Sequence, residues 1–394
     1  MAALDPKTAR MVAGVELNAL ALTGVFPKEQ LAGAEVVEEA TAIHDIDGEV
    51  LFHRFAVVRG REDVGAVDVA ADEVLGDLLL AYGDGQTWNP KALLGEARQR
   101  GIEGGMGCDD FDELRFVAYS YPKLAVQFLR TGEEVAMLEL FTWVPVPPAG
   151  ESEHEPLRPG AFERWSLRRE LGDEDRKLRS ERFNERLGAI RDLREHMHEF
   201  GLIPWRIEPE RWWEVIVIRL VETREIRYSL RSSHHTSCYE LRGQETNVWC
   251  VAASTQMLLD FYRYEYTQTR LAEELGLGTH ANPNGLPYSR VGDVVTAIEA
   301  LTSDALDATM VTNPTFATFR NEIRANRPLV SFVPGHSRTV AGYTQNLIPV
   351  LSRNNFQGLL VYDPWPPNAG VITRWENFAT QVYQYAYTAR VGKV

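Results

Sequence analysis

The chain has 394 residues, 44% of them hydrophobic and 25% charged, with a formal net charge of −15 at neutral pH. Its length exceeds that of one ordinary hydrophobic core, so two or three domains are expected. The residues from Thr236 onward hold 12 basic and 13 acidic side chains, so nearly all of the negative charge precedes them. This acidity argues against nucleic acid or an anionic membrane as a partner.

Three cysteines are present, Cys108, Cys238 and Cys250, and this odd, small number does not suit a disulfide-stabilised secreted protein. The first residues lack the charged start and the apolar run of a signal peptide. No segment approaches the roughly 18 consecutive apolar residues of a membrane-spanning helix. The sequence therefore predicts a cytoplasmic protein, or one that is exported without a cleavable signal peptide, and no membrane partner.

The first part of the chain mixes strand and helix patterns. Segments 50–58 and 135–146 have the apolar and aromatic content of buried strands. Segment 69–82 carries Val and Leu at helical spacing, and segment 90–100 predicts an amphipathic helix with Asn89 as its N-cap. These patterns predict a domain of the mixed α/β class.

A Pro-rich, acidic stretch at 145–156 then predicts a linker. From Ala161 to Phe200 the chain is dense in Arg and Glu, which predicts one long, solvated helix with a narrow apolar stripe. Two strand-like runs follow, at 212–221 and 226–230. The apolar stripe of the helix recurs every three or four residues, at Phe183, Leu187, Ile190, Leu193 and Met197.

The most informative residues surround Cys250, which opens a predicted helix. A thiol at a helix N-terminus faces the positive end of the helix dipole, and this favours the nucleophilic thiolate. A cysteine at such a position is by itself more often structural, but two neighbours favour catalysis. Gln244 lies six residues earlier, where its side-chain amide can join the Cys250 backbone N–H in an oxyanion hole, and Trp249 packs the turn.

The pattern Gln-x5-Cys, with Trp before the cysteine and Ala-Ala shortly after it, resembles the active-site helix of papain-like cysteine peptidases. It is most similar to the compact bacterial branch, which includes staphopain-like enzymes, plant-pathogen effector proteases and the peptidases that trim double-glycine leaders. The resemblance covers roughly residues 238–392. It implies a helical half, which carries the nucleophile helix, packed on a twisted antiparallel sheet.

A thiolate needs a base, and His336 stands out among the nine histidines. It lies between two apolar runs, in Val-Pro-Gly-His-Ser-Arg-Thr-Val-Ala-Gly-Tyr, where the edge of a sheet can aim it at the helix. This context also resembles the family's Gly-His-x3-Val-x-Gly-Tyr strand. His234, His235 and His280 fall in predicted loops and are interpreted as surface residues.

A third residue should orient the imidazole and hold its tautomer. Asp363 ends the buried run Gly-Leu-Leu-Val-Tyr-Asp, and Trp365 follows two residues later. In papain-like enzymes an Asn or Asp ends the strand after the histidine strand, and a Trp two positions on shields the pair from water. An Asp-Pro turn is common by itself, so the prediction depends on the chain order Gln, Cys, His, Asp.

The sequence thus predicts an α+β fold in three parts. Residues 1–148 form a separate mixed α/β domain that regulates the enzyme or recruits its substrates. Residues 149–235 hold the linker, the charged helix and a strand pair, where an inhibitory pro-segment would sit. Residues 236–394 form the papain-like peptidase domain. We expect a latent form in which the N-terminal region binds the peptidase domain, with recruitment of a protein substrate as the competing hypothesis.

The expected activity is that of a cysteine endopeptidase that cleaves a protein or peptide substrate through a thioester acyl-enzyme. No metal or organic cofactor is required, and Cys108 has no partner at metal-ligand spacing. One alternative is a deamidase or acyltransferase of the same fold that acts on a Gln side chain. Another is a catalytically dead binding module, against which the complete residue set argues. Nucleophile, base, orienting residue and oxyanion donor are predicted to be Cys250, His336, Asp363 and Gln244.

Overall fold

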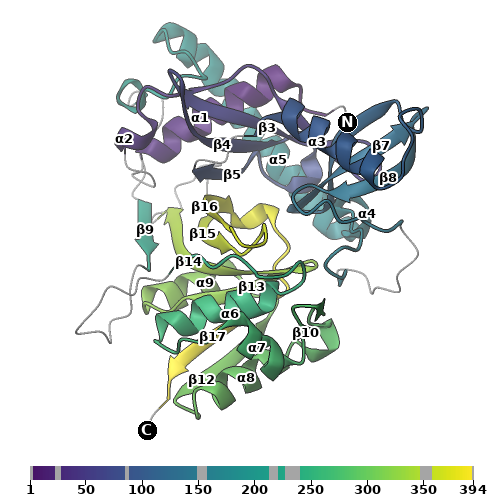
Figure 1. The fold of residues 1–394 in the computed structure, drawn as a ribbon. Helices are drawn as coiled ribbons and strands as arrows, with labels where there is room; N and C mark the ends of the chain where they lie inside the picture. Colours follow the sequence, from purple (N-terminus) through teal and green to yellow (C-terminus); the bar gives the residue numbers. More distant parts are fainter. Residues whose placement is uncertain are drawn as a thin grey trace.

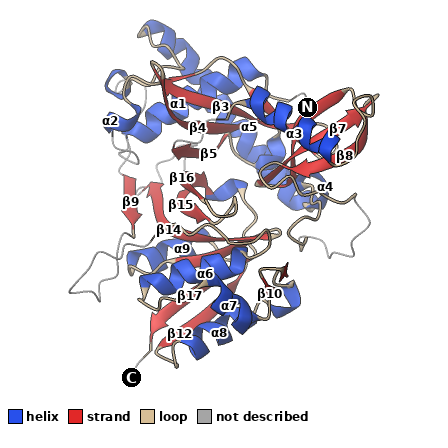
Figure 2. Ribbon diagram, viewed as in Figure 1, coloured by secondary structure: helices blue, strands red, loops and turns tan. Residues whose placement is uncertain are grey.

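The computed structural model describes residues 3–22, 28–84, 88–148, 158–212, 221–226, 240–346 and 357–392. In Figure 1 the N-terminal half, residues 3–212, lies above the C-terminal half, residues 221–392. Figure 2 shows helices and strands mixed in both halves, and the strands pair mostly antiparallel. The predicted α+β class is therefore confirmed.

The N-terminal half places helices against a strongly apolar sheet. Helix α1 is buried along much of its length and contacts β3, β4 and β5. In α5 the predicted apolar stripe is confirmed, because Phe183, Leu187, Ile190 and Met197 are buried and Leu193 is partly buried against the same core. The strands are β1 (Glu35–Val36), β2 (Thr41–Asp45), β3 (Val50–Arg59), β4 (Glu62–Ala70), β5 (Leu79–Asp84), β6 (Glu113–Ser120), β7 (Lys123–Arg130) and β8 (Glu133–Glu139). The helices are α1 (Pro6–Leu22), α2 (Lys28–Leu31), η1 (Glu73–Leu75), α3 (Pro90–Glu103), α4 (Leu167–Glu170), α5 (Asp173–Glu199) and η2 (Pro209–Arg211).

The C-terminal half packs helices on an antiparallel sheet. Helices α6, α7 and α8 share one hydrophobic cluster with strands β12, β13 and β17, and α9 packs in a second cluster over β13, β14 and β15. The strands are β9 (Val221–Glu225), β10 (Gly278–Thr279), β11 (Asn282–Pro283), β12 (Leu306–Thr312), β13 (Leu329–Val333), β14 (His336–Asn346), β15 (Gln357–Asp363), β16 (Val371–Asn377) and β17 (Tyr385–Val391). The helices are α6 (Cys250–Phe261), α7 (Gln268–Leu275), η3 (Tyr288–Arg290), α8 (Asp293–Leu301), α9 (Phe316–Arg324) and η4 (Phe378–Thr380).

The prediction of a helix over 69–82 is wrong. The segment holds the end of β4, the short turn η1 and most of β5. Asp72 caps the turn by accepting a hydrogen bond from the Val74 N–H, and Gly76 ends it with φ of 80°. Of the three leucines that suggested a helix, Leu79 and Leu80 are buried in β5 and Leu78 is buried just before it. Periodicity does not separate a buried strand from a helix in a short apolar run.

Other local predictions succeed to different degrees. Strand β3 matches segment 50–58, and α3 begins behind Asn89, whose side chain accepts a hydrogen bond from the Ala92 N–H. The expected strand at 135–146 is divided, because β8 ends at Glu139 and the chain turns before it returns in a bridge between Leu138 and Pro145. The charged helix α5 starts at Asp173, later than the first charged residues suggested.

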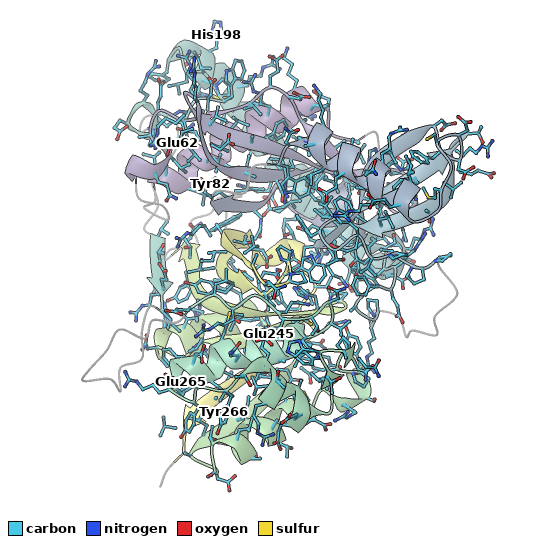
Figure 3. The ribbon with its side chains drawn as sticks, viewed as in Figure 1. Glu62, Tyr82, His198, Glu245, Glu265 and Tyr266 are labelled. Atoms are coloured by element: carbon cyan, nitrogen blue, oxygen red, sulfur yellow. The ribbon has the colours of Figure 1, made fainter. Side chains whose placement is uncertain are left out.

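One sheet runs through both halves, in the order β12-β17-β13-β14-β15-β16-β5-β4-β3-β2-β6-β7-β8. The junction is the antiparallel pair β16–β5, in which Trp375 faces Tyr82, labelled in Figure 3. Trp375 is 2% exposed and belongs to the hydrophobic core of the N-terminal half. Asn377 Nδ2 also donates to Asp77 Oδ2 and to the Leu79 carbonyl, both at 3.0 Å. The two halves are therefore joined by core packing and by main-chain pairing.

The predicted boundaries near residues 148 and 235 fall beside segments outside the described residues, so the three-part division stays a prediction. The predicted strands 212–221 and 226–230 also lie mostly outside the described residues. The described strand β9 falls on the connection that was predicted between them, and it pairs with β14. Within the described residues, no helix combines the length and apolarity needed to cross a bilayer.

Candidate active site

Cys250 is the first residue of α6, as the sequence predicted. Its side chain is 9% exposed, and the face of α6 behind it is buried in the domain core. Trp249 precedes it and is fully buried, with its indole Nε1 donating to the Leu277 carbonyl at 3.0 Å. The tryptophan thus fixes the turn into α6 and with it the direction of the thiol.

His336 and Asp363 are brought together by neighbouring strands. His336 begins β14, Asp363 ends β15, and the two strands pair antiparallel. His336 Nε2 lies 2.6 Å from Asp363 Oδ1. This contact leaves Nδ1 as the ring nitrogen available to Cys250, whose side chain shares a hydrogen bond with His336. The order thiol, imidazole, carboxylate is the arrangement needed for a base-activated nucleophile.

The electrostatics of this group favour an ion pair between thiolate and imidazolium. Burial by itself raises the pKa of the Cys250 thiol. The hydrogen bond and the charge of His336 act against burial, as do the Ser337 N–H and the charge of Lys123, and the resulting pKa is below its ordinary value. Burial lowers the pKa of His336, but the charge and hydrogen bond of Asp363, together with Cys250, raise it to about 9. The lowered pKa of Cys250 increases the fraction of the attacking thiolate.

Gln244 is held by the loop that follows Asp363. Its N–H donates to the Pro364 carbonyl at 2.9 Å, and its carbonyl accepts from the Asn368 N–H at 2.8 Å. The side chain is 1% exposed; Nε2 donates to the Thr246 carbonyl at 2.6 Å, and Oε1 has no hydrogen-bond partner among the described residues. One N–H of the amide therefore serves the local turn. Gln244 is not among the residues that line the cleft beside Cys250, so its oxyanion role stays a prediction.

Trp365 connects the site to the N-terminal half. Its N–H donates to Asp363 Oδ1 at 2.9 Å, which helps to orient the carboxylate. Its indole Nε1 donates to Glu139 Oε1, at the end of β8, at 3.2 Å. Its ring lies edge-on to Phe162, with 6.3 Å between the ring centroids. Trp365 thus lies beside Asp363, as predicted for a shielding residue, and its outer contacts come from the N-terminal half.

A cleft of about 340 Å³ opens beside Cys250 and His336. One wall is formed by residues 158–161 and Glu163, here called the strap, which follow the predicted linker. A second wall is formed by residues 285–289, which lead into η3. The floor between the walls is mostly apolar and includes Val251, Val291 and Phe332.

Several groups near the site carried no sequence signal. Lys123 and Glu139 precede Cys250 by more than a hundred residues, and the strap precedes it by nearly a hundred. Nothing in their local sequence indicates that they lie near the site. Only the pairing of the two halves brings them to the site. Conversely, Cys238 and residues 231–236 lie outside the described residues. His280, read as a surface residue, is half-exposed and lies 2.9 Å from Glu245.

No group of three or more His, Cys, Asp or Glu side chains is placed to hold a metal ion in the part of the chain that the structure describes. The chemistry of the donor set around Cys250 is likewise that of proton transfer and nucleophilic attack: one thiol, one imidazole, one carboxylate and one amide.

Comparison with known proteins adds a family to this geometry. Residues 237–392 match the Peptidase_C39 like family. The match supports a papain-like cysteine peptidase fold for this part of the chain. Among solved structures, the crystal structure of UfSP from C. elegans is similar to this chain at 12% identity with a TM-score of 0.25, over 46% of this chain and 36% of that one. This chain thus spans little more than a third of that protein. No curated protein sequence matches it.

Proposed function

We propose that this chain is a cysteine endopeptidase that hydrolyses peptide bonds in a protein or peptide substrate through a thioester on Cys250. The observation that carries the proposal is the alignment of Cys250, His336 and Asp363 beside an open cleft. The match of residues 237–392 to a peptidase family supports it.

In the proposed reaction the Cys250 thiolate attacks the scissile carbonyl carbon, and the carbonyl oxygen gains the negative charge. The Cys250 backbone N–H and the free N–H of Gln244 stabilise this oxyanion. The His336 imidazolium then donates its proton to the leaving amine as the C–N bond breaks. A water molecule, deprotonated by His336, attacks the thioester and releases the acid and the thiolate. Asp363 holds the imidazole in one tautomer throughout.

The test of this proposal uses a thiol-directed epoxide such as E-64 and a set of casein-like and short peptide substrates. We expect a single adduct on Cys250 by peptide mass spectrometry, and loss of hydrolysis by orders of magnitude in Cys250→Ala. Activity above a few per cent in a folded Cys250→Ala variant would overturn the assignment. Release of ammonia without cleavage of the peptide would instead identify a deamidase or acyltransferase of the same fold.

A latent form belongs to the same proposal, because the strap lines the cleft beside the nucleophile. Glu163 Oε2 accepts a hydrogen bond from the Gly160 N–H at 2.7 Å and so holds the strap in shape. A tethered segment needs only weak contacts to restrict a cleft, since its effective concentration is high. The competing role of the N-terminal half is recruitment of a protein substrate.

These two roles separate in the full chain with a short peptide that needs no recruitment. Under restraint, Glu163→Ala loosens the strap and raises kcat/KM by about tenfold or more. Glu103→Ala, at an exposed position on α3, is the matched control and should leave the rate unchanged. Equal rates in Glu163→Ala and the wild type would discard restraint by the strap and leave recruitment.

A further inference from the structure

The N-terminal half places a lysine at the back of the candidate active site. Lys123 begins β7, and its side chain is buried, with 6% of the residue exposed. Its Nζ donates to the Gly335 carbonyl at 3.2 Å and to the Ala161 carbonyl. Gly335 directly precedes His336, so the ammonium group is bonded to the turn that delivers the imidazole.

The turn and its N-terminal neighbours are closely packed. Gly335 has φ of 65°, and a Cβ there would lie 2.7 Å from the Gly160 carbonyl oxygen and 3.0 Å from Lys123 Nζ. The Ser120 hydroxyl, at the end of β6, donates to the Pro334 carbonyl at 3.4 Å. Residues of β6, β7 and the strap thus enclose the turn at 334–335, and little space is left for it to move.

The ammonium group also acts on the site through its charge. The charged groups that face Lys123 are Cys250, Glu139, Glu163 and Asp363, and its Nζ lies 5.1 Å from the centre of the Tyr119 ring. Burial lowers the pKa of Lys123 to about 8, so that it is mostly protonated at neutral pH. The same charge helps to lower the pKa of the Cys250 thiol.

We propose that Lys123 is a positioning residue of the peptidase, which holds the Gly335–His336 turn and supplies a fixed positive charge to the Cys250–His336 pair. The role of Lys123 in catalysis rests on the proposed function. Its hydrogen bond to the turn and its effect on the Cys250 thiol can be measured without any turnover of substrate. It makes the N-terminal half a working part of the active site, whether or not the strap also restricts the cleft.

The experiment measures the rate at which iodoacetamide alkylates Cys250 as a function of pH, read at the Cys250 peptide by mass spectrometry. Lys123→Met removes both the charge and the hydrogen bonds, whereas Lys123→Gln removes the charge and keeps a donor for the Gly335 carbonyl. Lys123→Arg keeps the charge. Lys91→Met, at an exposed position on α3, is the matched control for loss of a lysine charge.

We expect the alkylation midpoint to move upward by about 0.5 pH unit or more in Lys123→Met and Lys123→Gln, since a nearby cation favours the thiolate. Lys123→Arg and Lys91→Met should keep the wild-type midpoint. Circular dichroism shows which of the two neutral variants folds. If the alkylation midpoint of that variant is unchanged, the proposal is overturned, even if its alkylation rate falls. Alkylation requires no substrate, so a chain that cleaves no peptide still gives an answer for Lys123, and failure of the proposed function is seen separately.

Discussion

At the scale of single residues, Asp363 serves two neighbours with one oxygen. Its Oδ1 accepts the Trp365 N–H at 2.9 Å and lies 2.6 Å from His336 Nε2. The contact with the Trp365 backbone N–H holds the carboxylate in the orientation in which it contacts the imidazole. The charge of this carboxylate is also the largest of the effects that raise the pKa of His336. The orientation and the protonation of the imidazole therefore depend on the same atom.

This dependence predicts the pH profile of hydrolysis. Activity needs the His336 proton, and the folded-state pKa of about 9 places the basic limb near that pH. Because this pKa lies above the ordinary 6.5, the proton also contributes stability that is complete below pH 6.5 and is lost as the pH rises through 9. The acidic limb follows the lowered pKa of the Cys250 thiol. In Asp363→Asn, which keeps the shape of the side chain, the basic limb should move to lower pH. The profile of kcat/KM against pH checks this, and an unmoved limb would contradict it.

Gln244 provides a second prediction at this scale. Its side chain is buried with one N–H uncommitted among the described contacts, and its main chain is held by the Asp363 loop. Gln244→Ala should lower kcat by about 10²–10³-fold, the usual effect of losing one oxyanion donor. Gln99→Ala, on the exposed face of α3, is the control. The comparison needs kcat and KM separately, and a Gln244→Ala variant as fast as wild type would exclude the oxyanion role.

At the scale of elements, the contact between β15 and β16 depends on a glycine. A Cβ on Gly358 would lie 1.8 Å from Trp375 Nε1, a distance that no side chain tolerates without displacement of the indole. The indole is itself buried against the N-terminal core. The glycine thus permits the close approach through which β16 meets both of its neighbours.

Gly358→Ala should therefore reduce the free energy of unfolding by about 1–3 kcal/mol or more, as expected for overpacking of a well-filled core. Gly95→Ala is the matched control, because Gly95 lies within α3 and a Cβ there meets no atom within 4 Å. In that variant the helix should be unchanged or slightly more stable. Urea denaturation of both variants gives the comparison. Equal free energies of unfolding for the two variants would show that the indole moves aside without loss of stability.

At the scale of the whole molecule, β5 and β16 make one sheet of the two halves. Removal of everything before Thr236 would turn β16 into an edge strand and expose Trp375. The same truncation would remove Lys123 and Glu139 from the active site. A separately expressed C-terminal half is therefore a poor substitute for the full chain.

We expect such a truncated chain to lose cooperative unfolding or to melt well below the full-length protein, with increased binding of a hydrophobic dye. Differential scanning calorimetry of the two chains under the same conditions checks this. The expectation fails if the truncated chain unfolds in one sharp transition at the full-length temperature. In that case its activity on a short peptide would also become a fair measure of restraint by the N-terminal half.

The residues of the C-terminal site could be predicted from the sequence more completely than the fold around them. Gln244, Cys250, His336 and Asp363 stand in short patterns whose chemistry depends on near neighbours, and the start of α6 and the ends of β14 and β15 followed from those patterns. The pairing of β5 with β16 left no such trace, because main-chain hydrogen bonds between strands distant in sequence require no particular side chain. For the same reason Lys123 could not be recognised, and the leucines near Leu79 suggested a helix where the sheet required a strand.

Strand β17 has a consequence for the order in which the molecule can be made. It follows β12 and β13 in sequence, yet lies between them and pairs with both. Phe332, in the cleft floor, faces Tyr385 of β17, and the Gln384 N–H donates to the Phe332 carbonyl at 2.8 Å. While a ribosome is still translating residues before 385, β12 and β13 have no strand between them and the cleft floor lacks its support. A nascent chain can therefore carry Cys250 and His336 before it holds a finished cleft, and the proposed proteolysis would begin only after synthesis has passed β17.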